Sequence, residues 1–215
     1  RFRLAGKFPA GRKPLDLTAA DLDRDGDLDL AATVPEEESV AVLANADGTG
    51  SFSAPTMLRV VNAPFAVVAA DLNSDGALDL ASTNRLSADL SVFLNATEAK
   101  SPRMGRAEFT PAANYALGDR AYELGDRAYG LKCADLDGDL DLDAASVAGG
   151  VDRIALLKND GKGAFAGPAY VTVEPYPNVL DAADLDLDGD VDLAIACGGN
   201  GRAGSTGGIE VCDGV

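Results

Sequence analysis

The chain has 215 residues, with 35 acidic and 18 basic side chains, no histidine and a formal charge of −17. This charge excludes nucleic acid as the default partner, because phosphate binding needs a basic surface. The missing histidine excludes Ser-His and Cys-His nucleophile pairs and histidine-ligated metals, which leaves metals that oxygen ligands satisfy. At 47% hydrophobic residues the chain can bury a core, and no apolar run is long enough to insert directly into a membrane.

Four acidic segments recur along the chain. Each follows an alanine, and their first aspartates are 50, 64 and 49 residues apart: Asp21, Asp71, Asp135 and Asp184. The long interval contains two insertions of seven residues, one in the duplicated stretch 117–130 and one between Asn95 and Phe109. A period of about 50 residues is typical of propeller and solenoid repeats. The repeats are approximately 11–61, 62–118, 125–174 and 175–215.

Within each repeat, apolar residues alternate in short runs. In the first repeat these runs lie around Leu17, Leu30, Val42 and Met57, and Pro, Gly, Asn or Asp residues separate them. Short alternating runs with such boundaries predict strands, and four strands per repeat predict the blades of a β-propeller. We therefore expect residues 1–215 to form one all-β domain of four-stranded antiparallel blades.

The two ends of the chain bear on how the propeller closes. Residues 2–10 are a possible fourth strand of the last blade, and this pairing would give a closed four-bladed ring without an exposed sheet edge. The alternative is that the four blades are part of a larger propeller. The chain begins at Arg1 without a methionine or a signal-peptide pattern, which predicts a processed product or an excised segment.

Each acidic loop has the form D-x-D/N-x-D-x-x-x-D. Positions 1, 3, 5 and 9 can direct side-chain oxygens to one point, and position 7 can add its backbone carbonyl. Ca²⁺ takes six to eight oxygen ligands, whereas Mg²⁺ needs a stricter octahedron and more water. Without a cation the carboxylates would repel one another, and we expect the loops to be disordered or splayed. The predicted ligands of up to four Ca²⁺ ions are Asp21, Asp23, Asp25, Asp27, Asp29, Asp71, Asn73, Asp75, Ala77, Asp79, Asp135, Asp137, Asp139, Asp141, Asp143, Asp184, Asp186, Asp188, Asp190 and Asp192.

The four predicted sites are not equal. The loops that begin at Asp21 and Asp184 have every ligand and a glycine at position 6, so they are expected to bind Ca²⁺ most strongly. The second loop replaces one carboxylate with Asn73 and should bind more weakly. In the third loop, Leu140 occupies the glycine position and Gly138 lies two places earlier, which leaves the geometry of this loop open.

Two other readings of the acidic loops are possible. The EF-hand shares the opening of the pattern, but it needs a glutamate at position 12 and flanking helices. Position 12 is Ala32 in the first loop and Ile195 in the fourth, so an EF-hand is excluded. A merely solvated acidic turn does not explain four copies in register.

The acidic loops, the 50-residue period and the phenylalanine–proline stretches at Phe52, Phe109 and Phe165 resemble the FG-GAP/VCBS-type repeat family. The integrin α-subunit propeller is its best-known relative. The resemblance implies β-propeller blades, calcium between the first two strands of each blade, and extracellular or cell-surface roles. The chain departs from the family in blade count, because integrin-type propellers are usually seven-bladed. The element that names the family is only partly present, near Phe165-Ala-Gly-Pro168.

We therefore predict a calcium-stabilised binding, adhesion or scaffold module that is extracellular or at the cell surface and is not an enzyme. Its expected partner is an extracellular protein or a glycan; the oligomeric state is left open. The candidate partner-binding loops are 97–108, the duplicated 117–130 and the glycine-rich 198–208. The main alternative is a glycan-binding lectin, although tryptophan is absent. A less favoured alternative is the propeller part of a polysaccharide-degrading enzyme.

Cysteines and one sequon complete the candidate features. Cys133 lies among small apolar residues and is expected to be a buried thiol rather than a reactive one. Cys197 and Cys212 flank the glycine-rich loop and could pair in an oxidising compartment. Asn95-Ala96-Thr97 is a glycosylation sequon, usable only if the protein is secreted.

Overall fold

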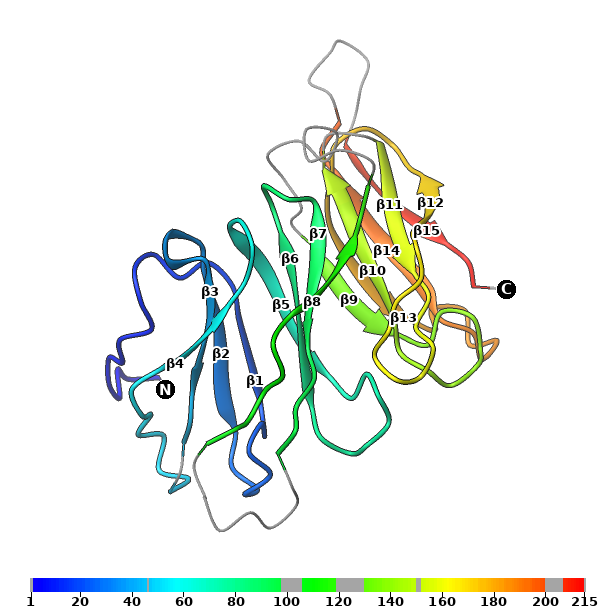
Figure 1. Cartoon of the computed structure of the whole chain (residues 1–215). Coiled ribbons are helices and arrows are strands. Elements are labelled where there is room, and N and C mark those ends of the chain that lie inside the picture. The colour runs from blue at the N-terminus through cyan, green and yellow to red at the C-terminus, as the bar shows by residue number, and fades with distance from the viewer. Residues whose placement is uncertain are drawn as a thin grey trace.

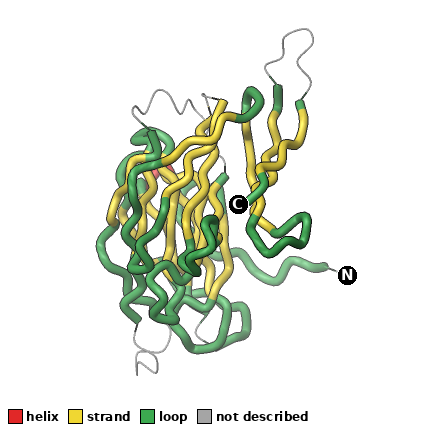
Figure 2. Tube along the Cα trace, turned by 90° about the vertical axis from the view of Figure 1, so that its right-hand side faces the viewer, coloured by secondary structure: helices red, strands yellow, loops and turns green. Residues whose placement is uncertain are grey.

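A computed structural model describes residues 2–45, 47–97, 106–118, 130–149, 152–199 and 207–214. These residues form four antiparallel sheets. The first two lie at the left and in the centre of Figure 1, and the third and fourth overlap at its right. Figure 2 shows the loops gathered at the two ends of the strands. The predicted all-β, propeller-like architecture is confirmed. No helix among the described residues is long and apolar enough to cross a membrane.

Each sheet lies within one sequence repeat. The first sheet contains β1 (Leu17–Ala20), β2 (Asp29–Val34), β3 (Ser39–Leu43) and β4 (Thr56–Arg59), with a short 3-10 helix η1 (Pro35–Glu37) between β2 and β3. The second contains β5 (Pro64–Ala70), β6 (Asp79–Asn84), β7 (Asp89–Phe93) and β8 (Ala113–Ala116). The third contains β9 (Leu131–Ala134), β10 (Asp143–Gly149), β11 (Asp152–Leu157) and β12 (Ala169–Thr172). The last contains β13 (Pro177–Ala183), β14 (Asp192–Cys197) and β15 (Gly208–Cys212).

The central strands of each sheet are buried on both faces. In β3, successive side chains point to opposite faces of the sheet. Val40 and Val42 therefore pack toward the second sheet, whereas Ala41 and Leu43 pack on the outer face of the first sheet beside Val34. This two-sided burial explains why the strands contain apolar residues at both alternating positions.

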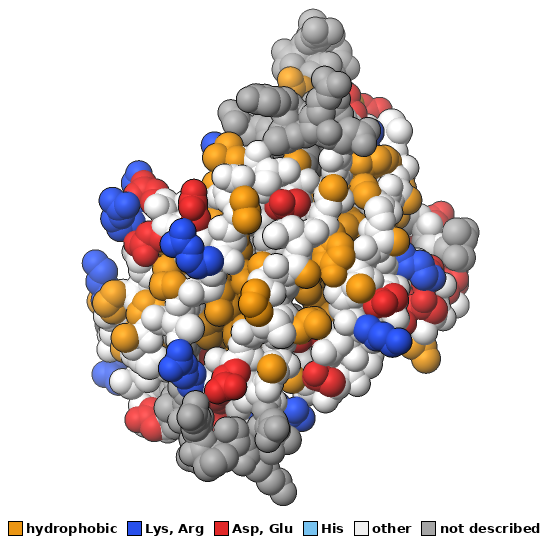
Figure 3. All heavy atoms as spheres, in the orientation of Figure 1, with side chains coloured by type: hydrophobic (Ala, Val, Ile, Leu, Met, Phe, Trp, Pro, Cys, Tyr) orange, Lys and Arg blue, Asp and Glu red, His pale blue; other side chains and the backbone are white. Residues whose placement is uncertain are grey.

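Hydrophobic clusters fill the three interfaces between neighbouring sheets. Figure 3 shows hydrophobic side chains gathered in the middle of one face, where the sheets adjoin. Full burial of a Leu, Ile or Phe side chain contributes roughly 1.5–3 kcal/mol, so these clusters supply most of the stabilisation between sheets. Their largest fully buried members are Phe93, Leu22, Leu72, Leu80, Leu90, Leu117, Ile154, Leu157, Leu180 and Ile195.

Buried asparagines add polar links between sheets. The Nδ2 of Asn95 donates to the carbonyl of Leu22 in the preceding sheet at 2.7 Å and to Leu78 in its own sheet at 2.9 Å. Asn159 repeats the arrangement one sheet later, donating to Leu72 at 2.7 Å. Each asparagine thus connects the end of a third strand to the acidic loop of the sheet before it.

The hydrogen bonds of Asn95 also determine whether the predicted sequon can be glycosylated. Asn95 is only 2% exposed, and its amide nitrogen is engaged by two carbonyls. The sequon at Asn95 is therefore not available for glycosylation in the folded chain.

The predicted closed four-bladed ring is wrong. Residues 2–10 contain no strand, and the Phe8 ring lies edge-on to Phe52 with centroids 5.2 Å apart. Phe8 and Ala10 cover the apolar outer face of the first sheet, beside Val34, Ala41 and Leu43. The last sheet therefore has three strands, and the termini lie at opposite ends of the row (Figure 1). This open row is consistent with the alternative, part of a larger propeller.

The possible disulfide between Cys197 and Cys212 is not formed in the structure, where both cysteines are free. In the β14–β15 pair, Cys197 lies opposite Gly208 and Cys212 lies opposite Leu193. This register separates the two cysteines by four residues along the strands, about 13 Å, which is beyond the reach of a disulfide. Burial, with a smaller effect from Asp143, raises the pKa of the Cys133 thiol to about 12, as expected of an unreactive thiol.

The asparagine links predict a difference between two similar substitutions. Asn159→Ala leaves the carbonyls of Leu72 and Leu142 without their amide donor, and we expect it to lower the free energy of unfolding by about 2–3 kcal/mol. The control is Asn45→Ala, because the Asn45 amide donates to the Leu28 carbonyl of its own sheet, at 3.3 Å. This variant should lose about 1 kcal/mol. Urea denaturation measures both, and equal losses would contradict the inter-sheet role.

Candidate metal centres

The four acidic loops join the first and second strands of each sheet and share one hydrogen-bonding pattern. The N–H of position 6 donates to the position 1 carboxylate at 3.1, 2.9, 3.0 and 3.2 Å in the four loops. The N–H of position 7 donates to the position 5 carboxylate at 2.9, 2.8, 3.0 and 3.0 Å. Position 1 is the aspartate that opens each loop: Asp21, Asp71, Asp135 and Asp184.

The position 9 carboxylate holds each loop to its sheet. One oxygen accepts from the N–H of position 2 at 3.0, 2.9, 3.4 and 2.8 Å. The other accepts from the N–H two residues beyond the third strand at 2.8, 2.7, 2.8 and 2.9 Å. All four carboxylates are buried: Asp29, Asp79, Asp143 and Asp192.

The electrostatic surroundings of these buried carboxylates differ. Burial raises the pKa of Asp29 and Asp143, and it raises the pKa of Asp79 to about 6, although backbone donors act in the opposite direction. At Asp192 the donated hydrogen bond from Gly214 is the largest influence, and the pKa is lowered.

The backbone of the third loop has the same shape as the others, which settles the geometry that the sequence left open. Position 4 has a left-handed φ of 63, 58, 76 and 67° in Arg24, Ser74, Gly138 and Leu187. Position 6 has a left-handed φ of 97, 82, 73 and 104° in Gly26, Gly76, Leu140 and Gly189. Both positions favour glycine, and the third loop has its glycine at position 4 instead of position 6.

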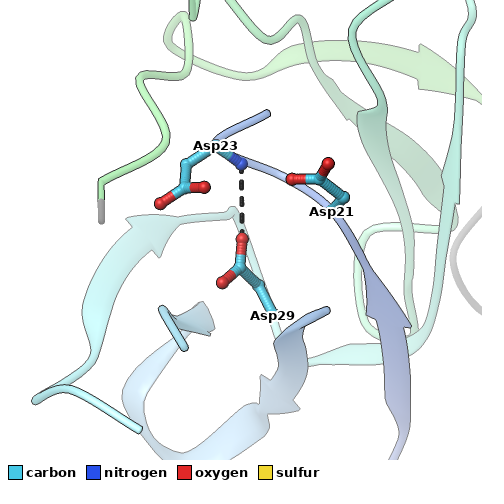
Figure 4. A group of neighbouring side chains, drawn as sticks. All are labelled: Asp21, Asp23 and Asp29. Atoms are coloured by element: carbon cyan, nitrogen blue, oxygen red, sulfur yellow. Dashed lines mark hydrogen bonds between the residues drawn. The ribbon is translucent and has the colours of Figure 1, made fainter. Parts of the chain in front are cut away.

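The first loop brings Asp21, Asp23 and Asp29 together, with one carboxylate oxygen of each within 4.8 Å of the others. Figure 4 shows Asp29 reaching from its strand to the N–H of Asp23, at 3.3 Å. Burial, followed by the charges of Asp29 and Asp25, raises the pKa of Asp23 to about 6. Asp21 Oδ1 and Asp23 Oδ2 are buried and have no hydrogen-bond partner. Buried carboxylate oxygens without partners are costly, so this loop fits a cation.

The second loop satisfies part of its own acidity. The Nδ2 of Asn73 donates to Asp75 at 2.9 Å, and the N–H of Asp75 donates to both Asp71 and Asn73. The amide at position 3 therefore occupies a carboxylate oxygen that an aspartate would leave free.

In the third loop, a lysine side chain of the same protein contacts the acidic cluster. Asp135, Asp137 and Asp139 lie within 4.8 Å of one another. The Lys158 ammonium forms ion pairs with Asp137 and with Asp139, the latter at 3.0 Å. These contacts raise the pKa of Lys158, and the pKa of Asp139 is lowered by the N–H of Asp141 and by Lys158.

In the fourth loop, Asp184, Asp186 and Asp192 lie within 4.8 Å of one another. The combination matches that of the first loop: positions 1, 3 and 9. The loop is more exposed than the first at positions 3 and 5, where Asp186 and Asp188 face solvent.

The side chains at positions 5 and 7 also have contacts with the backbone of the loop or of the neighbouring turn. The position 5 side chain accepts from the N–H of position 7 in every loop. The position 7 carboxylates of Asp27 and Asp141 lie against glycines of the turn after the third strand, where a Cβ on Gly48 or Gly161 would come within 2.5 Å of a carboxylate oxygen. These two side chains therefore lie against the turn after the third strand, and the ligand role of the position 7 carbonyl stays a prediction.

Two kinds of residue at these loops were not predicted from the sequence. Asn45, Asn95 and Asn159 each lie 16 residues after the position 9 aspartate that they hold, and this constant offset was the available signal. Lys158 gave no such signal, because its contact with Asp137 depends on the fold.

Comparisons with known proteins agree with this architecture. A family model of the FG-GAP-like repeat matches residues 21–82 and 135–195, each of which contains two acidic loops. The curated proteins contain no match.

Two solved structures are similar in fold. An Agrocybe aegerita lectin that recognises non-reducing terminal N-acetylglucosamine has a TM-score of 0.55 and 18% identity over 90% of this chain and 50% of its own. The Photorhabdus luminescens Tc holotoxin pore has a TM-score of 0.53 and 20% identity over 92% of this chain and 9% of its own. The chain therefore spans half or less of each structure, and likeness at this identity shows the fold alone.

The family match is independent of these structures. It covers more than half of the chain and contains the acidic loops built above. The chain belongs to the FG-GAP-like repeat family.

Proposed function

We propose that this chain is a calcium-stabilised, extracellular binding or scaffold module without catalytic activity of its own. The observation that carries the calcium role is the pair of buried carboxylate oxygens, Asp21 Oδ1 and Asp23 Oδ2, that have no hydrogen-bond partner. A divalent cation beside them would supply the missing partner and offset the burial and the neighbouring charges of Asp29 and Asp25 that raise the pKa of Asp23.

The chemistry of the ligands favours Ca²⁺ over other metals. All candidate ligands are carboxylate, amide or carbonyl oxygens, which suit hard cations. In the first loop Asp21, Asp23 and Asp29 would hold the ion, and in the fourth loop Asp184, Asp186 and Asp192 would hold it. The bound ion would supply positive charge that fixes each loop on its strands, and no reaction step is assigned to it.

A binding role is supported by a cavity at the other end of the strands. The cavity is about 410 Å³ and lies between the first and second sheets. Leu15, Pro64 and Phe65 provide apolar walls, and Lys13 and Glu36 add charge. Most ligand sites combine apolar walls with a few polar groups. The three loops predicted to bind a partner, 97–108, 117–130 and 198–208, lie largely outside the described residues.

Glycan binding is the second candidate, and the fold shared with the Agrocybe aegerita lectin favours it. The cavity beside Lys13 and Glu36 is one place in the described chain with room for a sugar. We therefore include N-acetylglucosamine-terminated glycans among the ligands to be tested.

Calcium should stabilise the folded chain. Each site contributes about 2.7 kcal/mol when free calcium is 100 times its Kd, so chelation should lower the melting temperature and added calcium should restore it. Differential scanning calorimetry with EDTA, calcium or magnesium measures the effect. An unchanged melting temperature in all three conditions would contradict the calcium role.

Because Asp23 Oδ2 has no hydrogen-bond partner, substituting Asp23 should have opposite effects on calcium affinity and on stability in chelator. Asp23→Asn removes a ligand, and the calcium affinity of the first loop should fall about 10- to 100-fold, the range that we adopt from losses at metal sites. In chelator the same variant should be at least as stable as the wild type, because it removes one of several crowded charges. The control Asp152→Asn changes an exposed carboxylate outside the loops and should change neither quantity. A variant less stable than the wild type in chelator would contradict the repulsion argument.

The glycan hypothesis is tested at the cavity. If a glycan binds there, Lys13→Ala should weaken binding to an N-acetylglucosamine-terminated array at least fivefold and leave the calcium-dependent melting temperature unchanged. Lys162→Ala, a change of the same size in the third sheet, is the control. The absence of any glycan signal for the wild type would remove this candidate.

A further inference from the structure

Lys158 lies at the same end of its sheet as the third acidic loop, because the end of β11 pairs with the start of β10. The residue lies one position beyond β11, and its ammonium contacts the carboxylates at positions 3 and 5 of the loop, Asp137 and Asp139. Asp135, at position 1, belongs to the same cluster. A single positive group therefore lies among the carboxylates that would otherwise bind a metal.

The equivalent positions of the first and second sheets have no such group. Lys158 directly precedes Asn159, whose N–H holds the position 9 aspartate. The residues that directly precede Asn45 and Asn95 are Ala44 and Leu94. Neither side chain carries a charge, so the tethered cation is specific to the third sheet among these three.

The first and third loops differ in what their acidic oxygens contact. In the first loop, buried oxygens of Asp21 and Asp23 lack a partner. In the third loop, Asp137 and Asp139 both have the Lys158 ammonium. The two loops share the hydrogen bonds donated by positions 2, 6 and 7 and the left-handed φ at positions 4 and 6. They differ at positions 3 to 5, where Asp25 donates to Asp23 in the first loop and Gly138 donates to Asp135 in the third. The cation that contacts the third loop is the side chain of Lys158.

We propose that the Lys158 ammonium takes the place of the calcium ion in the third acidic loop, which therefore binds no calcium under conditions that fill the first and fourth loops. The proposal rests on the calcium role proposed above for the other loops. It reduces the expected number of calcium ions from four to three at most.

The physical basis is the competition between a tethered and a free cation. An ammonium offers three donors, and Lys158 already satisfies two carboxylates. A group linked to its partner by the fold acts at a high effective concentration. A calcium ion would first have to displace this group and leave it without its two carboxylates. The residues of the third loop therefore do not fit calcium as those of the first loop do.

Calcium counting tests the proposal directly. Titration calorimetry and equilibrium dialysis on the whole chain should give at most three ions for the wild type. Lys158→Met should bind one ion more than the wild type. Lys158→Arg keeps the charge and should not gain an ion, and Lys162→Met, which removes a lysine four residues away, should match the wild type. Lys158→Gln replaces Lys158→Met if the latter does not fold.

A second measurement reports the ammonium independently of the other sites. In chelator, Lys158→Met should melt at a lower temperature than Lys162→Met, because Asp137 and Asp139 lose the ammonium that pairs with both of them. Added calcium should raise the melting temperature of Lys158→Met by more than it raises that of Lys162→Met.

The outcomes separate this inference from the proposed function. Four ions on the wild type, or equal ion counts for the wild type and a folded Lys158→Met, would overturn the inference while calcium binding stands. No ions on the wild type but one on Lys158→Met would overturn the proposed calcium role and support the inference. No ions on either protein would overturn both.

Discussion

The structure depends on one buried carboxylate in each sheet, the aspartate at the first residue of the second strand. Its two oxygens accept N–H groups from the start of the acidic loop and from the chain just beyond the third strand. Hydrogen bonds to a charged acceptor are stronger than those between neutral groups. Three parts of the sheet are thereby held at one point, and the loop carboxylates are positioned around it. The asparagines that donate to this point in three sheets continue the connection into the neighbouring sheet in two of them.

This arrangement brings negative charges close together, and the repulsion between them is compensated differently in each loop. Holding an aspartate in the interior of the sheet places the remaining loop aspartates close to a buried negative charge. The second loop replaces one carboxylate with an amide that donates to its neighbour. The third loop receives an ammonium from its own sheet. The first loop leaves two buried oxygens without partners, so an external cation is its remaining source of compensation.

The sequence predicted what local patterns determine. The repeat, the short alternating strands and the position of each acidic loop follow from residue order alone, because strand periodicity and turn residues act over a few positions. Contacts between distant segments were not predicted. The Asn159 bond to Leu72 joins residues 87 apart in the sequence, and the packing of Phe8 on Phe52 competes with the strand pairing that a closed ring required. Cys197 and Cys212 do not lie opposite each other, because the register of β15 on β14 is set by the whole strand pair.

The position 9 aspartate and its asparagine lie 16 residues apart in the first three sheets. The interval from this asparagine to the phenylalanine that it pairs with varies instead. Asn159 pairs with Phe165, whereas a longer segment separates Asn95 from its partner Phe109. The duplicated heptapeptide also lies outside the fixed interval. In the last sheet the equivalent hydrogen bond, from Gly214 to Asp192, spans 22 residues, so the segment between the second and third strands also accepts added residues. New sequence can therefore enter a repeat at two places, between these strands or between the asparagine and the next acidic loop, without rebuilding the fold.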